Sequence, residues 1–310
     1  MTRDQVTAVI LTYNEDLHID RCLDRLRGIA DRLVVIDSFS TDGTVGKARA
    51  AGAEVFQHAF TNHAAQFAWG LEAAGIDSGW VLRIDADEYI EPALIDEIRA
   101  TLPTLPEDVT GVEMRRKVFF QGQWIRWGGY YKTILTRLWR AGAAHIEQRW
   151  MDEHVVMLHG RTIWLKGGDL VDDNLKDLTS WTEKHNSYTT RQMVEFLNLE
   201  YPLFAPTGAD EELNAHAQRK RFLRNAVYAR TPLYLRATLY FLQRYFLRLG
   251  ILDGRKGFVF HFLQGYWNFM LMDAKVGEGR RYIAQHGLAS FRTHLAQRHG
   301  IRLDGPDAPA

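Results

Sequence analysis

Two aspartates separated by a single residue, Asp85 and Asp87, are the residues of this 310-residue sequence that most clearly suggest chemistry. They follow the apolar run Trp80–Leu82, which predicts a buried strand. Alternate residues of an extended chain point to the same side, so both carboxylates would project together from the strand's carboxyl end. Paired carboxylates repel each other, and a divalent cation with oxygen ligands relieves that repulsion. The spacing predicts a metal site that holds a diphosphate; the alternative is a strand end with acidic capping residues.

Strands and helices alternate along the first 90 residues and would place the two aspartates at the edge of a sheet. The expected strands are short apolar runs, at residues 6–12, 33–36, 54–57 and 80–84. The expected helices lie between these runs, at residues 17–26, 45–51 and 64–74. This alternation predicts an α/β fold with a doubly wound, mainly parallel sheet. Such sheets bind ligands at the carboxyl ends of their strands.

Polar residues follow three of these strands and should meet at one rim of the sheet. The first strand runs into Thr12, Tyr13, Asn14 and Glu15, and the second begins its polar loop at Asp37. An aromatic ring and a carboxylate at that rim could stack on a base and accept its ring N–H. The residue types also suit helix caps and turns. Neither G-x-G-x-x-G nor G-x-x-x-x-G-K-[ST] follows the first strand, so phosphate binding would depend on metal and side chains.

The composition is typical of a globular protein with a substantial core, at 46% hydrophobic and 25% charged residues. A single cysteine, Cys22, rules out an internal disulfide, and the N-terminal stretch does not match a signal segment, so we expect a cytoplasmic protein. The net charge is zero, but basic residues greatly outnumber acidic ones after residue 215. That asymmetry suggests a region that faces an anionic partner.

Three segments, at residues 9–15, 35–44 and 84–88, resemble the motifs of glycosyltransferase family 2 in order and spacing. The likeness covers roughly residues 5 to 200 and is greatest to bacterial enzymes that build lipopolysaccharide core and other surface polysaccharides. It implies a GT-A fold, a nucleotide-diphosphate sugar donor (UDP-linked in our prediction), a Mn²⁺ or Mg²⁺ ion and inversion at the anomeric carbon. The resemblance assigns six residues to the nucleotide: Thr12, Tyr13, Asn14, Glu15, Asp37 and Asp85. It assigns the metal to Asp87, together with Asp85.

Inversion by direct displacement needs one general base to take the proton from the acceptor hydroxyl. A third acidic cluster, Asp152-Glu153-His154, supplies the candidates. Members of the resembled family carry an acidic pair or His-Glu at this place, with the second acid as base. We expect Glu153 to be the base, with Asp152 as the alternative. Non-catalytic binding of a nucleotide sugar by the same fold is the rival function, and a nucleotidyltransferase would need a basic, glycine-rich loop that the first strand lacks.

Further candidates for contact with acceptor or diphosphate are aromatic residues and a histidine. Trp124 and Trp127 lie in an aromatic loop and could pack on sugar rings, although core packing would explain them equally well. His185 and Tyr188 are three residues apart on an expected helix, hence on one face. The intervening stretch 169–174 reads as an acidic loop.

We expect two domains, a GT-A catalytic domain at 1–205 and a basic, aromatic-rich helical region at 206–310. Between 232 and 252, Arg236, Arg244 and Arg248 fall on one side of a helix and leucines on the other, which is typical of a helix lying in a membrane interface. An anionic inner-membrane surface and a homodimer contact are the two predicted uses of this region. The arginines are spread among aliphatic residues without a recognised module, so nucleic acid is not an expected partner.

Overall fold

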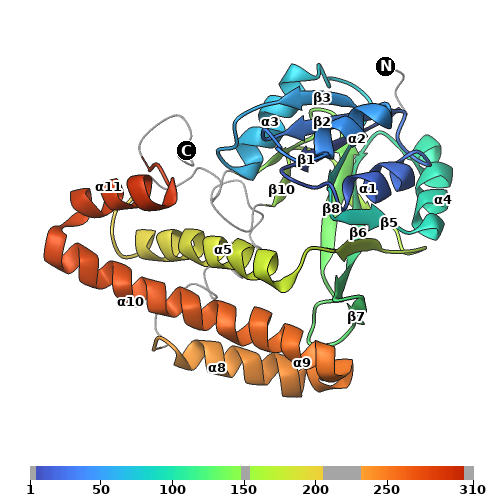
Figure 1. The fold of residues 1–310 in the computed structure, drawn as a ribbon. Helices are drawn as coiled ribbons and strands as arrows, with labels where there is room; N and C mark the ends of the chain where they lie inside the picture. The colour runs from blue at the N-terminus through green and yellow to red at the C-terminus, as the bar shows by residue number, and fades with distance from the viewer. Residues whose placement is uncertain (1–4, 148–153, 205–231, 304–310) are drawn as a thin grey trace. The chain divides into compact units, whose positions relative to one another are not determined.

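The computed structural model describes residues 5–147, 154–204 and 232–303 (Figure 1). The chain divides into two compact units, with the division after Leu175. The first comprises the described residues up to 175, and the second those from 176 onward. This division differs from the domain limit expected at residue 205, because the helix α5 (Leu178–Asn198) packs with the C-terminal helices.

Four parallel strands form one half of the main sheet, in the order β3-β2-β1-β4. The strands are β1 (Val6–Thr12), β2 (Arg32–Asp37), β3 (Glu54–Gln57) and β4 (Trp80–Asp85). The helices that alternate with them or follow are α1 (Ile19–Leu26), α2 (Thr44–Ala50), α3 (His63–Ala73), α4 (Pro92–Thr101) and the short η1 (Leu102–Thr104). Every strand and helix expected in the first 90 residues is confirmed.

The alternation of side chains along β1 explains why helices cover both faces of the sheet. Ala8 and Ile10 face a core that includes residues of α1, α2 and α4. Val9 faces a second core, which holds Phe67 of α3 and Trp139. Both faces of β1 are therefore buried, which accounts for its continuous run of apolar residues.

The other half of the sheet contains antiparallel pairs and continues from β4 in the order β8-β6-β12-β5. Its strands, with two further partners of β6, are β5 (Glu88–Ile90), β6 (Val109–Phe120), β7 (Gln123–Ile125), β8 (Ile134–Arg140), β11 (Arg161–Trp164) and β12 (Leu170–Asp173). A separate pair consists of β9 (Ala144–Ile146) and β10 (Val155–Met157). The predicted α/β class is confirmed.

The acidic loop expected at residues 169–174 is wrong, because β12 occupies most of that stretch. Leu170 and Val171 are buried, and the strand runs parallel to β6 and antiparallel to β5. The acids that suggested a loop form ion pairs, Asp172 with Arg116 and Asp173 with Arg21. These pairs allow two consecutive acids at the end of a strand in the sheet interior.

The second unit is helical and begins with α5. The Ser180 N–H donates to Asp177 Oδ1 at 2.8 Å, and this bond caps the first turn of the helix. The remaining helical segments are α8 (Leu235–Leu242), η2 (Gln243–Leu247), η3 (Gly250–Asp253), α9 (Gly254–Phe262), η4 (Leu263–Trp267), α10 (Asn268–His286) and α11 (Leu288–His299). At Gly279 a Cβ atom would lie 2.6 Å from Leu197, so glycine permits the close approach of α10 to α5.

The amphipathic helix expected at 232–252 differs from the structure in two respects, its length and the burial of one of its arginines. The helix ends before Leu249, which has a φ of 61°, and η3 follows at Gly250. Arg236 is buried against Asp273 instead of facing outward, while the leucines of the opposite side are exposed. The helical pattern of the sequence does not show which side of the helix faces the core. That side is set by Asp273, which pairs with Arg236 from 37 residues later in the chain. In the described ranges, no helix has the length and apolar character needed to cross a bilayer.

Candidate functional site

The carboxyl ends of β1, β2 and β4 meet at one rim, as the sequence predicts. Thr12 pairs in register with Asp37, and Leu11 pairs with Asp85. The loops that follow β1 and β2 are bonded to each other, since the Asn14 N–H donates to Ser40 Oγ at 2.8 Å. The rim is therefore a single structure built from three strand ends.

Asp37 is fully buried and organises the rim through its own protein contacts. Thr12 Oγ1 donates to Asp37 Oδ1 at 2.9 Å, and the Ser40 N–H and Gln57 Nε2 donate to Oδ2 at 2.9 and 3.0 Å. A carboxylate with several donors holds its geometry firmly. Contact of Asp37 with a nucleobase remains a prediction, and the structure gives this residue and Thr12 a positioning role in addition.

Tyr13 lies on the outer side of the rim, with 58% of its surface exposed. The next residue, Asn14, has a φ of 53°, a conformation that Asn adopts more readily than most residues. Its side-chain oxygen accepts the Thr41 N–H at 2.8 Å, which fixes the turn. The turn thus presents the Tyr13 ring to solvent, an arrangement compatible with stacking on a base.

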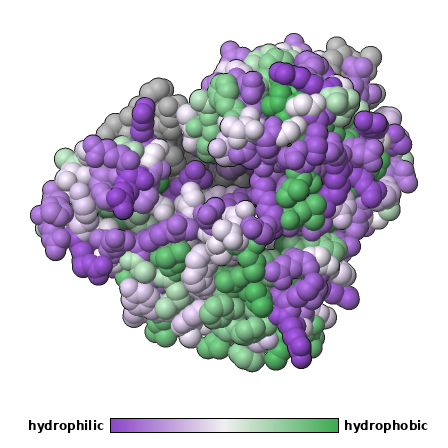
Figure 2. All heavy atoms as spheres, in the orientation of Figure 1, coloured by the Kyte–Doolittle hydropathy of each residue, from purple (hydrophilic) through white to green (hydrophobic). Residues whose placement is uncertain are grey.

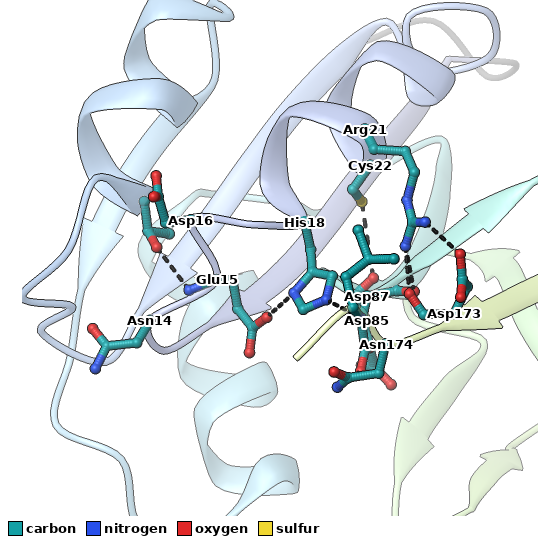
Figure 3. A network of polar contacts seen from close by, with 12 residues as sticks. Asn14, Glu15, Asp16, His18, Arg21, Cys22, Asp85, Asp87, Asp173 and Asn174 are labelled. Carbon is teal, nitrogen blue, oxygen red and sulfur yellow. Dashed lines mark hydrogen bonds and ion pairs between the residues drawn. The ribbon is translucent and has the colours of Figure 1, made fainter. Parts of the chain in front are cut away.

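A buried histidine, His18, connects this rim to the segment after β12 (Figure 3). The Leu175 N–H donates to His18 Nε2 at 2.8 Å, so the proton of the neutral ring is on Nδ1. Nδ1 lies 2.6 Å from Glu15 Oε2 and donates to it. The predicted nucleotide residue Glu15 is thereby held in place by a side chain that the sequence did not single out.

Asp85 and Asp87 both lie half-buried at the end of β4. Asp85 keeps 38% of its side chain exposed, and its Oδ2 is 3.4 Å from Arg137 Nη2. Asn174 Nδ2 donates to Asp87 Oδ2 at 2.9 Å (Figure 3). Carboxylate oxygens suit Mg²⁺ or Mn²⁺, and Mg²⁺ in phosphate sites takes only one or two protein carboxylates. Over the residues that the structure describes, no group of three or more His, Cys, Asp or Glu could hold a metal. Binding of a cation by the two aspartates stays a prediction, with phosphate and water as its expected remaining ligands.

Glu88, directly behind the two aspartates, is a site residue that sequence reasoning left without a role. It is buried, and its Oε2 accepts the Asp85 N–H at 3.0 Å while Arg137 Nη2 donates to Oε1 at 2.6 Å. Burial raises the pKa of Glu88 to about 7, against the opposing effect of Arg137. The signal in the sequence that could have revealed this role is Arg137, which lies in the largely apolar strand Ile134–Arg140. An arginine that is buried in a strand requires an acid as its partner.

Arginines neutralise the acids that lie behind the rim. Arg21 Nη1 is 2.6 Å from Asp173 Oδ2, and Arg21 also donates to the backbone oxygen of Asp87 at 3.4 Å. Arg116 pairs with Asp172, and this acid is the main cause that raises the pKa of the Arg116 guanidinium. Asp172, Asp173 and Glu88 are thus compensated by arginines within the protein. Asp85 and Asp87 keep part of their surface open to solvent.

The aromatic candidates lie in the first unit, on and just after β7. Trp124 and Trp127 are both half-buried. Trp124 packs edge-on to Tyr131 with ring centroids 4.8 Å apart, and the guanidinium of Arg126 lies 5.3 and 5.5 Å from the Trp124 and Trp127 rings. Trp124 thus has packing partners of its own, and its contact with a sugar stays a prediction, as does that of Trp127.

The remaining candidates are in the second unit or outside the described residues. His185 and Tyr188 share a face of α5, with ring centroids 5.7 Å apart, and His185 stacks on Trp181 at 3.5 Å. Their predicted contact with diphosphate or acceptor is untested. The candidate bases Asp152 and Glu153 lie outside the described residues.

Comparison with curated proteins finds relatives that are named as glycosyltransferases. Curated relatives include uncharacterized glycosyltransferases of Rickettsia bellii, 35% identical over 104 residues, and Rickettsia conorii, 36% identical over 95 residues. The matches cover 34% and 31% of this chain and 35% and 33% of the relatives, so the chain matches about a third of their length.

Solved structures with similarity to this chain include S. aureus TarS and a glucosyl-3-phosphoglycerate synthase. TarS is 16% identical over 63% of this chain and 40% of that chain, with a TM-score of 0.39. The synthase, from Mycobacterium tuberculosis and in complex with Mn²⁺, UDP and glucosyl-3-phosphoglycerate, is 25% identical over 38% of this chain and 45% of that chain, with a TM-score of 0.29.

The family model described as glycosyl transferase family 2 matches residues 7–163, just over half of the chain. The matched range contains the whole rim from Thr12 to Asp87 and the α/β sheet that positions it, an arrangement that fits the GT-A fold. The resemblance drawn from the three sequence motifs is thereby confirmed, and the chain belongs to glycosyltransferase family 2.

Proposed function

We propose that this protein transfers a sugar from a nucleoside diphosphate donor, UDP-linked, to a glycan acceptor. The observation that carries the proposal is the position of Asp85 and Asp87, which are half-exposed at and just after the end of β4. Asp85 pairs in register with Leu11, the residue before the polar end of β1. Tyr13 would stack on the base, and Glu15 would reach the nucleoside from its bond with His18. The family assignment of residues 7–163 supports the same activity.

The two aspartates would hold a divalent cation, Mn²⁺ or Mg²⁺, against the diphosphate. When bound, such an ion neutralises negative charge that develops on the departing diphosphate. The protein's own share is positional: Asn174 orients the Asp87 carboxylate, and the Asp85 N–H is tied to Glu88. Arg21, Arg116 and Arg137 neutralise the acids behind, which lowers the repulsion that a diphosphate would meet.

Transfer with inversion is the mechanism we propose. Glu153, or Asp152 as the alternative, takes the proton from the acceptor hydroxyl. The hydroxyl oxygen then forms a bond to the anomeric carbon, and the bond from that carbon to the diphosphate oxygen breaks on the opposite face. One base is sufficient because the leaving diphosphate departs as an anion. Loss of transfer in Glu153→Gln with transfer retained in Asp152→Asn would identify Glu153 as the base, and the reverse pattern would identify Asp152.

The acceptor we propose is a lipopolysaccharide-core glycan or another surface glycan, presented at the cytoplasmic face of the inner membrane. Trp124 and Trp127 are the side chains we propose for packing on its sugar rings, and His185 and Tyr188 are those for diphosphate or acceptor contact. Large aromatic faces suit the apolar faces of pyranose rings.

The test is donor hydrolysis and transfer, measured with a panel of nucleotide sugars in the presence of Mn²⁺ or Mg²⁺. We expect release of UDP from one UDP-sugar, dependent on the ion and abolished by chelation. Binding of UDP without turnover of any donor, alone or with surface-glycan acceptors, would contradict the enzymatic proposal. That result would favour a non-catalytic nucleotide-sugar-binding protein.

A further inference from the structure

The segment from Tyr234 to Phe262, here called the hairpin, turns its apolar side chains outward. Twelve of the 22 large apolar side chains that are exposed in the described residues fall within these 29 positions. Leu247 is 81% exposed, and Leu252 is 59% exposed. Figure 2 shows hydrophobic residues gathered over α8 and α9 at the bottom of the view. A patch of this kind on one element usually marks a binding surface.

A buried ion pair sets the orientation of α8. Arg236 donates through Nε to Asp273 Oδ1 at 2.7 Å, and the Tyr234 N–H donates to Asp273 Oδ2 at 2.7 Å. The Arg236 guanidinium also lies 4.4 Å from the Phe196 ring of α5. Because Arg236 is fixed inward, the leucines on the other side of α8 face solvent. This is the reverse of the usual arrangement in a water-soluble protein.

Aromatic packing between the two arms holds the hairpin in this form. Phe241 stacks on Tyr245 with centroids 5.3 Å apart and meets Phe262 and Tyr266 at 6.3 and 5.8 Å. Tyr245 meets Phe258 at 5.6 Å from the other arm. The outward apolar residues are therefore presented by a packed scaffold and do not need to fold around a partner.

The charges on the hairpin select an anionic partner. Arg248, Arg255 and Lys256 are exposed. Between residues 232 and 262 the sequence contains one acid, Asp253, and it is buried with His261 Nε2 at 2.9 Å from its Oδ2. The exposed surface of the hairpin is therefore apolar and basic, which complements an anionic lipid leaflet.

We propose that the outward face of the hairpin inserts into the surface layer of an anionic bilayer. This inference deepens the membrane location proposed above, since it names the surface and the mode of contact. The helical run 235–247 is about 20 Å long at ~1.5 Å per residue, against a hydrocarbon core of about 30 Å, so the hairpin lies in the interface. A second copy of the chain fits less well, because a two-fold contact would bring the same basic side chains together.

The first experiment measures partitioning of the full chain onto vesicles of phosphatidylcholine with and without phosphatidylglycerol. We expect binding to the anionic vesicles that survives high salt in part, because apolar burial is not screened. The variant Phe246→Ser/Leu247→Ser/Leu252→Ser should partition at least about tenfold more weakly, since each buried apolar side chain contributes strongly to insertion. All three side chains are exposed, so the fold should persist, as circular dichroism would verify.

Leu158→Ser is the matched control, because Leu158 is 56% exposed but belongs to the first unit. We expect it to partition as the unaltered protein does. Equal binding by the triple variant, or no binding of the full chain to anionic vesicles, would overturn the proposal. Donor hydrolysis without vesicles should be unchanged in the triple variant, so a failure of membrane binding and a failure of the proposed transferase activity would be distinguished.

A second experiment reports the environment of the outward face directly. An environment-sensitive fluorophore attached to Leu247→Cys should shift to the blue when phosphatidylglycerol vesicles are added. The native Cys22 is fully buried, and burial raises the pKa of its thiol, so labelling should be confined to the introduced site. An unshifted spectrum with vesicles would contradict insertion. A shift that grows with protein concentration in the absence of lipid would show a contact between copies instead.

Discussion

The rim at the ends of β1, β2 and β4 and the hairpin of the second unit arrange the same residue types in opposite ways. At the rim, apolar strands are buried and acids stand half-exposed at their ends. In the hairpin, Arg236 and Asp273 are buried as a pair while leucines and phenylalanines are exposed. The difference supports the surroundings proposed for each surface, which are phosphate and metal for the rim and lipid for the hairpin.

A common rule connects the two regions. Buried charges are stable only when an opposite charge or several hydrogen bonds compensate them. Glu88 with Arg137 and Asp273 with Arg236 both satisfy that rule, and in each case the pair fixes what its neighbours present to the outside. Glu88 is tied to the Asp85 N–H, and Arg236 orients the exposed leucines of α8. Substitutions of the exposed residues, or of the buried pairs that position them, test this comparison between the two regions.

The largest effect is expected for Asp87→Ala, which removes a presented carboxylate from the rim. Turnover of the donor should fall by at least about 10⁴-fold, because charge on the leaving diphosphate would lose its compensation. Thermal unfolding should stay close to that of the unaltered protein. Asp96→Asn, which changes an exposed acid on α4, is the control and should retain activity. Activity that survives Asp87→Ala would refute the metal assignment.

Asp273→Leu should be the most destabilising of the single changes proposed here, since it leaves Arg236 buried without its acid. Loss of one partner of a buried pair costs about 3–5 kcal/mol, and denaturant unfolding would measure it. The double variant Arg236→Met/Asp273→Leu removes both charges and should recover much of that loss. A double variant no more stable than Asp273→Leu would mean that the pair does not act as a unit.

Glu88→Gln should change how stability depends on pH. The pKa of Glu88 in the folded protein is about 7 and its ordinary value is 4.5, so between these values the folded state binds more protons than the unfolded state. The free energy of unfolding should therefore fall as pH rises from 4.5 to 7, and level off above 7, by roughly 1 to 3 kcal/mol. Metal-free unfolding curves should lose this slope in Glu88→Gln. An identical slope in both proteins would contradict the prediction.

The smallest effect is expected for His18→Phe, which keeps an aromatic ring but removes both of its bonds. Glu15 and the Leu175 N–H would each lose a partner, at a cost of about 1 kcal/mol per bond. We expect KM for the donor to rise about fivefold with little change in kcat. His159→Phe, at an exposed histidine of the same unit, is the control. An unchanged KM would mean that His18 does not position the nucleotide residues.

The sequence predicts the parallel half of the sheet and its rim because local signals determine both. Runs such as Val6–Thr12 can be buried on two faces only in a sheet covered by helices, and polar residues at strand ends must then meet. What could not be predicted depends on pairs distant in sequence. Asp172 and Asp173 read as loop residues until Arg116 and Arg21 are found beside them.

The orientation of α8 is the clearest example of this limit. Helical periodicity separates Arg236 from Leu235 and Leu239, but it is the same whichever side faces inward. The choice is made by Asp273, 37 residues later, which no local pattern links to Arg236. Likewise the role of Glu88 follows from Arg137, which lies 49 residues later on β8.

Calorimetric titration of UDP, with and without Mn²⁺, tests the central claim most directly. We expect UDP to bind the full chain far more tightly with the ion than without it, and Asp87→Ala to bind UDP equally weakly under both conditions. That pattern would tie the diphosphate to the carboxylates at the end of β4. Binding of UDP that is independent of the ion, or ion-dependent binding that survives Asp87→Ala, would contradict the account.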